Sequence, residues 1–307
     1  MSQCGLSVWT SPENATFDIV FVHGLRGHPE KTWTKDDILW PLDLLASDAK
    51  QCRIMSFGYD SAIVYSDTAH NYARDGECSS STHCSTRTDS QRKNQAKRPI
   101  LLVAHSLGGL VCATAIVLGD RSAKGDSIET IARHVQGMIF FGTPFGGSNL
   151  AKWGDLIRRV FDAVKKTDRS TLKTLQADSN DLKLLRTEFP DVIRKRNAGD
   201  NKVKIFFFFE ELDTYGQRVV EEHAASYQGL GEILPLRSDH LDMCKFTSKE
   251  DVKYKVVKAK IMDVVLNVVK LTPPESGSHI FYNYDKVINQ FGTGGSMHIE
   301  NQTFNFG

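Results

Sequence analysis

Ser106 is the residue of this sequence best placed to act as a nucleophile. It follows the apolar run Ile100–Ala104 and lies in the segment His105-Ser106-Leu107-Gly108-Gly109, ahead of a stretch with helical spacing. A strand, a tight turn and a helix in this order hold a serine in a strained conformation with its hydroxyl pointing out of the sheet. The alternative is a serine in an ordinary glycine-rich turn, which the flanking pattern does not favour.

A serine of this kind needs a histidine as general base, and with this type of turn the chain order is serine, acid, histidine. Four of the ten histidines follow residue 137, namely His223, His240, His279 and His298. His240 comes after the apolar run Ile233–Leu236 and just before the final predicted helix, where such a base belongs. We therefore expect His240 to be the base.

The acid should follow the strand that precedes the base in the chain. The apolar run Val203–Phe209 ends in Glu210-Glu211-Leu212-Asp213, which offers several carboxylates within one turn. Glu210 is the expected acid and Asp213 is the alternative, because the sequence does not determine which carboxylate faces the imidazole.

Acyl chemistry at Ser106 also requires backbone N–H groups that stabilise an oxyanion. One should come from Leu107, the residue after the nucleophile, and the other from Leu25, in the loop after the first clear strand. That loop superficially resembles a phosphate-binding loop, but Glu30 occupies the position before Lys31 where a glycine is required. Nucleotide binding is therefore excluded there.

The elements that must position these residues alternate between strands and helices. Short apolar runs at 18–24, 53–58, 99–105, 137–142 and 203–209 suit strands that are covered on both faces. Helical spacing lies between them, and a last helix is predicted over 249–271, before Pro273 and Pro274. The pattern predicts an α/β fold with a mostly parallel sheet.

A helical cap over the sheet is predicted at about 151–198. Between 151 and 196 it holds twelve basic and seven acidic residues. The favoured interpretation is a solvated helix face, and the alternative is a contact surface for anionic lipid headgroups.

Composition restricts the classes of function. The 307 residues include 38 Lys and Arg against 37 Asp and Glu, so no basic excess indicates nucleic acid as a partner. The six cysteines lack the spacing of a metal site or a disulfide framework, and nothing indicates a cofactor. Polar residues interrupt the first twenty positions, where a signal peptide would need an apolar run. We expect a cytoplasmic protein with free thiols and no metal.

Several motifs together resemble a known family. They are Phe21–Trp33, Trp40-Pro41, Ser56–Asp60, Ala104–Val111, Phe140–Ser148 and Asp239–Lys245. The set resembles the SERAC-like serine esterases, and more narrowly the SesB-type α/β hydrolases of filamentous fungi, which also occur as N-terminal domains of NOD-like receptors. The resemblance implies an α/β-hydrolase fold over residues 15–271 and lipase or esterase activity on lipid esters. It also implies a role in receptor-triggered cell death.

The resemblance matches Ser106, Glu210 and His240 to the family's nucleophile, acid and base. The sequence departs from the family at Gly76–Thr88, which is rich in Ser, Thr and Cys where the family has an amphipathic helix, so this segment is either a diverged lid or the result of a short frame error. Eight of the twelve residues of Ser79–Ser90 are Ser or Thr, which predicts a mobile loop there. The rival hypothesis for the whole domain is an inactive hydrolase fold that serves as a scaffold or binding module.

The last residues have a different composition. After a linker at 272–278, residues 279–307 combine Asn, Gln, Gly and aromatic side chains with few charges and no proline, as in cross-β segments. A flexible tail without regular structure is the simpler interpretation. The stretch Asn289–Gly295 resembles the sigma-type amyloid motif, which implies that a receptor with a matching motif templates the tail into a fibril, brings hydrolase domains together and switches on cell death. Membrane association on activation, through the basic cap, is a further expectation.

Overall fold

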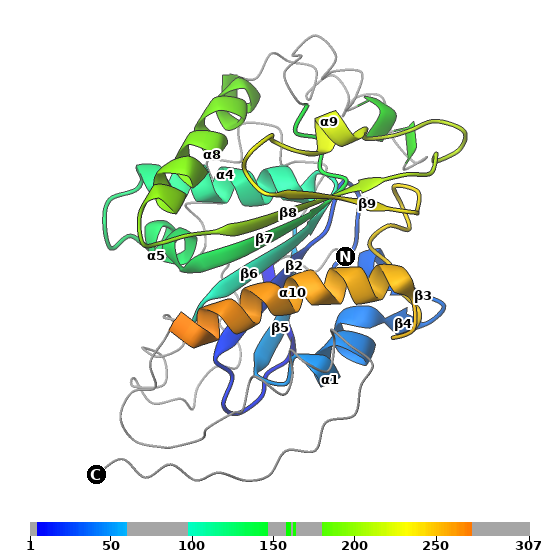
Figure 1. Ribbon diagram of the computed structural model, residues 1–307, viewed down its shortest axis with the longest axis horizontal. Helices are drawn as coiled ribbons and strands as arrows, with labels where there is room; N and C mark the ends of the chain where they lie inside the picture. The colour runs from blue at the N-terminus through cyan, green and yellow to red at the C-terminus, as the bar shows by residue number, and fades with distance from the viewer. Residues whose placement is uncertain (1–4, 60–97, 147–157, 161, 164–179, 272–307) are drawn as a thin grey trace, which may run out of the picture. The chain divides into compact units, whose positions relative to one another are not determined.

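The computed structural model describes residues 5–59, 98–146, 158–160, 162–163 and 180–271 (Figure 1). Residues up to Leu271 form one unit. The predicted loop at 79–90, the linker at 272–278 and the tail at 279–307 lie outside the described residues.

Seven strands form one sheet in the described part of the chain. Their order is β1-β5-β2-β6-β7-β8-β9, with β1 antiparallel to β5 and every other pair parallel. The bounds are β1 (Gly5–Thr10), β2 (Phe17–Val22), β5 (Cys52–Gly58), β6 (Ile100–His105), β7 (Val135–Phe141), β8 (Lys204–Glu210) and β9 (Glu232–Leu236). The predicted α/β fold with a mostly parallel sheet is confirmed.

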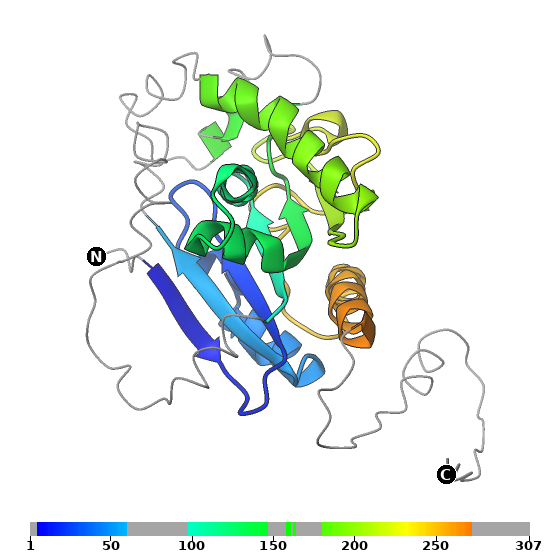
Figure 2. The same cartoon turned by 90° about the vertical axis from the view of Figure 1, so that its left-hand side faces the viewer.

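One face of the sheet is covered by helices that connect its strands. These are α4 (Gly108–Arg121), α5 (Ser127–His134), α8 (Asn180–Ala198) and the short α9 (Glu222–Ala225), and α8 packs along α4 (Figures 1 and 2). Ile116 of α4 and Phe189 of α8 belong to the same buried cluster as Phe140 and Phe207 of the sheet. The continuous apolar runs seen in the sequence follow from this two-sided burial.

The other face is covered by α10 (Val252–Leu271) and by the segment after β2. That segment comprises η1 (Lys31–Trp33), β3 (Thr34–Lys35), β4 (Ile38–Leu39), η2 (Pro41–Leu45) and α1 (Ala46–Asp48). Trp33 and Trp40 are fully buried and pack edge-on against Phe21, with ring centroids 4.9 and 5.3 Å away. No described helix is long and apolar enough to cross a membrane.

Strand β1 lies ahead of the domain boundary expected at residue 15. It pairs only with β5, at the edge of the sheet, and exposes Leu6 and Val8. Because one of its faces meets solvent, β1 lacks the continuous apolar run that marks the other strands.

Helix α8 lies within the range of about 151–198 that the sequence predicts as a cap. It connects β7 to the parallel strand β8 and packs on α4, so it is the crossover helix of that connection. Most of residues 151–179 lies outside the described residues.

The basic residues at the end of α8 have partners within the domain. Arg194 pairs with Asp191 and Lys195 with Asp120. Arg196 donates to the carbonyl oxygens of Ala132 and Val135, and burial lowers its pKa to about 10. Arg196 therefore has a structural role within the domain, whereas Arg194 and Lys195 are exposed side chains in surface ion pairs.

A buried ion cluster joins three neighbouring strands at the end of the sheet away from Ser106. Asp18 of β2 is 5% exposed and lies opposite Arg53 of β5. Arg53 donates to both Asp18 oxygens at 3.0 and 2.6 Å, and Arg98, just before β6, donates at 2.9 Å. The cluster favours one register among β2, β5 and β6.

The substitution Asp18→Asn should lower the free energy of unfolding by about 3 kcal/mol, because it leaves two partly buried guanidinium groups without their carboxylate. Urea denaturation followed by circular dichroism measures this. Asp191→Asn is the matched control, since Asp191 is 73% exposed in its pair with Arg194 and should have little effect. Equal losses in the two variants would contradict a structural role for the cluster.

Candidate active site

Ser106 lies in the strained turn that the sequence predicts. Its φ is +52°, a left-handed conformation that non-glycine residues rarely adopt. Its N–H donates to the Phe141 carbonyl at 2.8 Å, and its carbonyl accepts from Gly109 at 3.1 Å. The turn joins β6 to α4, whose first residue is Gly108.

The imidazole of His240 contacts Ser106. His240 Nε2 lies 3.0 Å from Ser106 Oγ, and both side chains are buried. On its other side, His240 Nδ1 faces a carboxylate, which can only accept a hydrogen bond from it. In the neutral ring Nδ1 therefore carries the hydrogen, and Nε2 is free to accept the hydroxyl hydrogen of Ser106.

Glu210 is the carboxylate that faces the base. It is fully buried at the end of β8, with Oε2 3.4 Å from His240 Nδ1, while Oε1 accepts the Val220 N–H. The separation of 3.4 Å is long for such a pair, and catalytic hydrogen bonds commonly shorten only when substrate is bound.

Asp213, the alternative acid, points elsewhere. Its carboxylate is 48% exposed and accepts a hydrogen bond from Arg218 Nε at 3.0 Å. The same guanidinium donates to the backbone carbonyls of Glu210 and Glu211. Asp213 therefore helps to shape the loop around Glu210 and does not face the imidazole.

The loop after β2 lies directly against the Ser106 turn. A Cβ added to Gly24 would lie 2.8 Å from Ser106 Cβ, and one added to Gly108 would lie 2.3 Å from the His23 carbonyl oxygen. Glycine is required at both positions because the two backbones touch. Leu25 and Leu107 belong to these touching segments, and neither donates its backbone N–H to another residue in the described part of the chain.

His23 holds the conformation of that loop. Its Nδ1 donates to the Gly24 carbonyl at 2.9 Å, while the Tyr59 hydroxyl donates to the His23 carbonyl at 2.7 Å. The two rings stack at 4.5 Å. Burial lowers the pKa of His23, which keeps the imidazole neutral. The sequence marked His23 as the end of a strand, and nothing in it pointed to the contact with Tyr59.

The absence of a side chain at Gly142 leaves room for the imidazole of His240. Gly142 follows β7 with a φ of +54°, and a Cβ there would lie 2.9 Å from His240 Nδ1. A side chain at this position would displace the imidazole as well as strain the backbone.

The described thiols are poor alternatives to Ser106 as a nucleophile. Cys52, Cys112 and Cys244 are buried, and burial raises the pKa of each to about 12. A thiol with such a pKa forms almost no thiolate near neutral pH.

No group of three or more His, Cys, Asp or Glu in the described residues could hold a metal ion. Cys78, His83 and Cys84, the cysteines and histidine that lie close together in the sequence, are outside the described residues.

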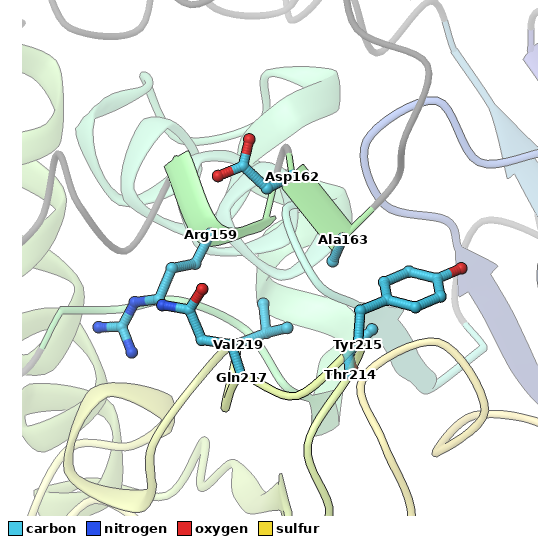
Figure 3. Close-up of a pocket in the computed structure, with 7 residues that line it drawn as sticks. All are labelled: Arg159, Asp162, Ala163, Thr214, Tyr215, Gln217 and Val219. Atoms are coloured by element: carbon cyan, nitrogen blue, oxygen red, sulfur yellow. The ribbon is translucent and has the colours of Figure 1, made fainter.

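A small cavity of about 130 Å³ lies beside the loop that follows Glu210 (Figure 3). In Figure 3 the helical residues 158–160 and 162–163 lie on one side and the loop residues on the other. The lining residues are Arg159, Asp162, Ala163, Thr214, Tyr215, Gln217 and Val219. Ser106 does not line the cavity, which therefore lies next to the loop at residues 214–219 and not next to the nucleophile.

The arrangement as a whole can transfer an acyl group. It contains a hydroxyl next to an unprotonated imidazole nitrogen, and a buried carboxylate at the opposite ring nitrogen. Two backbone amides adjoin the hydroxyl's turn, where charge would develop on a carbonyl oxygen.

Comparisons with known proteins identify the family of this chain. Residues 19–244, about three quarters of the chain, match the model of the Alpha/beta hydrolase family. Protein SERAC1 of Bos taurus is 27% identical over 270 residues, covering 81% of this chain and 39% of that protein. Protein SERAC1 of Danio rerio is 28% identical over 273 residues, covering 81% and 39%. The chain thus spans about two fifths of the length of these curated relatives.

Solved structures that resemble the fold of this chain include MGS-MChE2, an alpha/beta hydrolase enzyme from a sediment metagenome. It has a TM-score of 0.46 and 13% identity, covering 86% of this chain and 97% of that one. The Bacillus licheniformis lipase BlEst2 has a TM-score of 0.43 and 18% identity, covering 83% and 96%.

The match to the family model includes the Ser106 turn, the Glu210 strand end and the loop at His240. The parallel sheet has the helices on both faces that the fold of this family requires. The chain belongs to the alpha/beta hydrolase family.

Proposed function

We propose that this protein is a serine esterase that hydrolyses carboxylic acid esters, with lipid esters as the substrate class. The observation that carries the proposal is the contact of 3.0 Å between Ser106 Oγ and His240 Nε2, with buried Glu210 at the other ring nitrogen. Membership of the alpha/beta hydrolase family supports it. The lipid part rests on the resemblance of the sequence motifs to the SERAC-like esterases.

In the proposed reaction, His240 Nε2 takes the hydroxyl proton as Ser106 Oγ bonds to the ester carbon. The carbonyl oxygen becomes an oxyanion, and the N–H groups of Leu25 and Leu107 are the proposed donors to it. As the carbon–oxygen bond breaks, His240 gives the proton to the leaving alcohol. Water then attacks the acyl-enzyme with His240 again as base, which releases the acid and restores Ser106.

Glu210 stabilises the imidazolium that forms in both steps. Its full burial makes the charge interaction strong, because no solvent screens the carboxylate from the ring. The backbone N–H of Val220 holds the other carboxylate oxygen in place.

Replacing the nucleophile tests the proposal and distinguishes an active esterase from an inactive hydrolase fold that serves as a scaffold. Ser106→Ala should reduce kcat for a short p-nitrophenyl ester by at least about 10⁴-fold, since the covalent step disappears. It should also abolish labelling by a fluorophosphonate probe. Purified wild-type protein is the positive control. An unlabelled wild-type protein with no esterase activity would favour the scaffold.

Two amide substitutions, three positions apart in the sequence, test the identity of the acid. Glu210→Gln should lower kcat by about 10³–10⁴-fold, because the amide cannot stabilise the imidazolium. Asp213→Asn is the matched control and should have a mild effect, since Asp213 faces Arg218. Steady-state kinetics on the same ester gives both values, and the opposite ranking would move the acid to Asp213.

We further propose a signalling role for residues 279–307, on their composition and on the resemblance of Asn289–Gly295 to a sigma-type amyloid motif. A NOD-like receptor with a matching motif would template this segment, bring hydrolase domains together and start cell death. The segment would be ordered only when stacked, so the free protein would remain soluble until seeded.

A peptide of residues 278–307 should form fibrils that bind thioflavin T. The double substitution Phe291→Pro and Gly294→Pro should prevent this, because proline has no N–H to donate to the hydrogen-bond ladder between stacked strands. The proline variant and the parent peptide are compared at equal concentration with and without seeds. A parent peptide that stays monomeric even when seeded would remove the signalling role and leave the esterase proposal unaffected.

A further inference from the structure

The backbone of His240 is held by hydrogen bonds on both sides. Its N–H donates to Thr214 Oγ1 at 3.0 Å, and its carbonyl oxygen lies 2.8 Å from His105 Nε2. All three residues are buried. With the two contacts of the ring, every polar atom of His240 has a partner: two come from the end of β6 and two from the end of β8 and the loop after it.

The hydrogen bond between His105 and the His240 carbonyl oxygen can run in only one direction. A carbonyl oxygen only accepts, so His105 Nε2 must carry the hydrogen. Burial, with a smaller contribution from the neighbouring His240, lowers the pKa of His105 to about 3. His105 is therefore neutral throughout the range in which an esterase works, and its Nε2–H remains a donor. The donor is adjacent in sequence to Ser106, so the contact joins the nucleophile's strand to the base.

The contact from Thr214 comes from a rigid turn. Thr214 and Gln217 exchange backbone hydrogen bonds at 2.9 and 3.2 Å around Tyr215 and Gly216, whose φ angles are +52° and +81°. Positive φ at both central residues is the signature of a type I′ turn, which closes a two-residue hairpin. This turn begins four residues after Glu210.

Arg218 ties that turn to the strand end that carries the acid. Its guanidinium donates to the carbonyls of Glu210 and Glu211 and to the Asp213 carboxylate. The loop that orients the acid therefore also presents the Thr214 hydroxyl to the backbone of the base.

We propose that Thr214 and His105 are positioning residues that set the separation between His240 Nε2 and Ser106 Oγ by holding the His240 backbone from both sides. The catalytic consequence rests on the proposed esterase function. A reacting group displaced by about 1 Å can cost about 100-fold in rate, so two contacts that fix the base have a large effect without touching substrate.

The experiment uses an isosteric pair at one position. Thr214→Val keeps the shape of the side chain and removes the acceptor, whereas Thr214→Ser keeps the hydroxyl. Thr214→Val should lower kcat for a p-nitrophenyl ester by about 10- to 100-fold with little change in KM. Thr214→Ser should recover most of the lost rate. Equal losses in both variants, or none in Thr214→Val, would overturn the proposal.

His105 provides a second pair. His105→Gln keeps an N–H donor, whereas His105→Leu removes it. Fluorophosphonate labelling should be slower in His105→Leu than in His105→Gln, measured on protein whose circular dichroism matches the wild type. Equal labelling rates would overturn the role of His105.

A readout independent of turnover separates this inference from the esterase proposal. In ¹⁵N-histidine NMR spectra, His240 of the wild type should carry its hydrogen on Nδ1 and accept at Nε2. Thr214→Val should mix the two tautomers, and Thr214→Ser should not. If the wild type has no esterase activity but this contrast persists, the esterase proposal fails and the positioning role stands; if the contrast is absent, the positioning role fails.

Discussion

The left-handed backbone of Ser106 is the constraint on which the site depends. A non-glycine residue in this region costs on the order of 1–3 kcal/mol and persists only where its surroundings determine it. Here the hydrogen bond from Ser106 to the Phe141 carbonyl and the touching backbones at Gly24 and Gly108 do so. The strain turns the hydroxyl out of the sheet toward His240. The same packing brings the segment that contains Leu25 against the turn that contains Leu107.

The surrounding layers supply the rigidity that this strain requires. The sheet is buried on both faces by two apolar clusters, one against α4 and α8 and the other against α10 and the two tryptophans after β2. Strands β2, β6 and β7 lie side by side, and the loops that follow them carry Gly24, Ser106 and Gly142. Because the carboxyl ends of parallel strands share one edge, the residues of the site meet there.

Polar contacts around the base form a connected network and not a set of separate pairs. Glu210, at the end of β8, faces the ring of the base, while Thr214 and Arg218, in the connection between β8 and α9, hold the backbone of the base and the loop itself. His105 adds a contact from β6. In a buried environment such hydrogen bonds reinforce one another, and each unsatisfied group would be costly.

The sequence alone determined the parallel strands of the sheet and the order of the nucleophile and the base. Apolar runs buried on both faces are visible without a structure, and His240 is the histidine that comes directly after the apolar run Ile233–Leu236 and before the final helix. Residues 279–307 likewise have a composition distinct from that of the domain.

Only the tertiary structure decided which carboxylate faces the imidazole. Glu210 and Asp213 lie in the same turn of sequence, and their directions depend on Arg218 drawing Asp213 outward while Val220 holds Glu210 inward. The edge strand β1 and the crossover role of α8 also emerged only from pairing and packing. Thr214 gave no signal, because an isolated threonine acquires its partner, the backbone of a residue 26 positions away, only when the chain is folded.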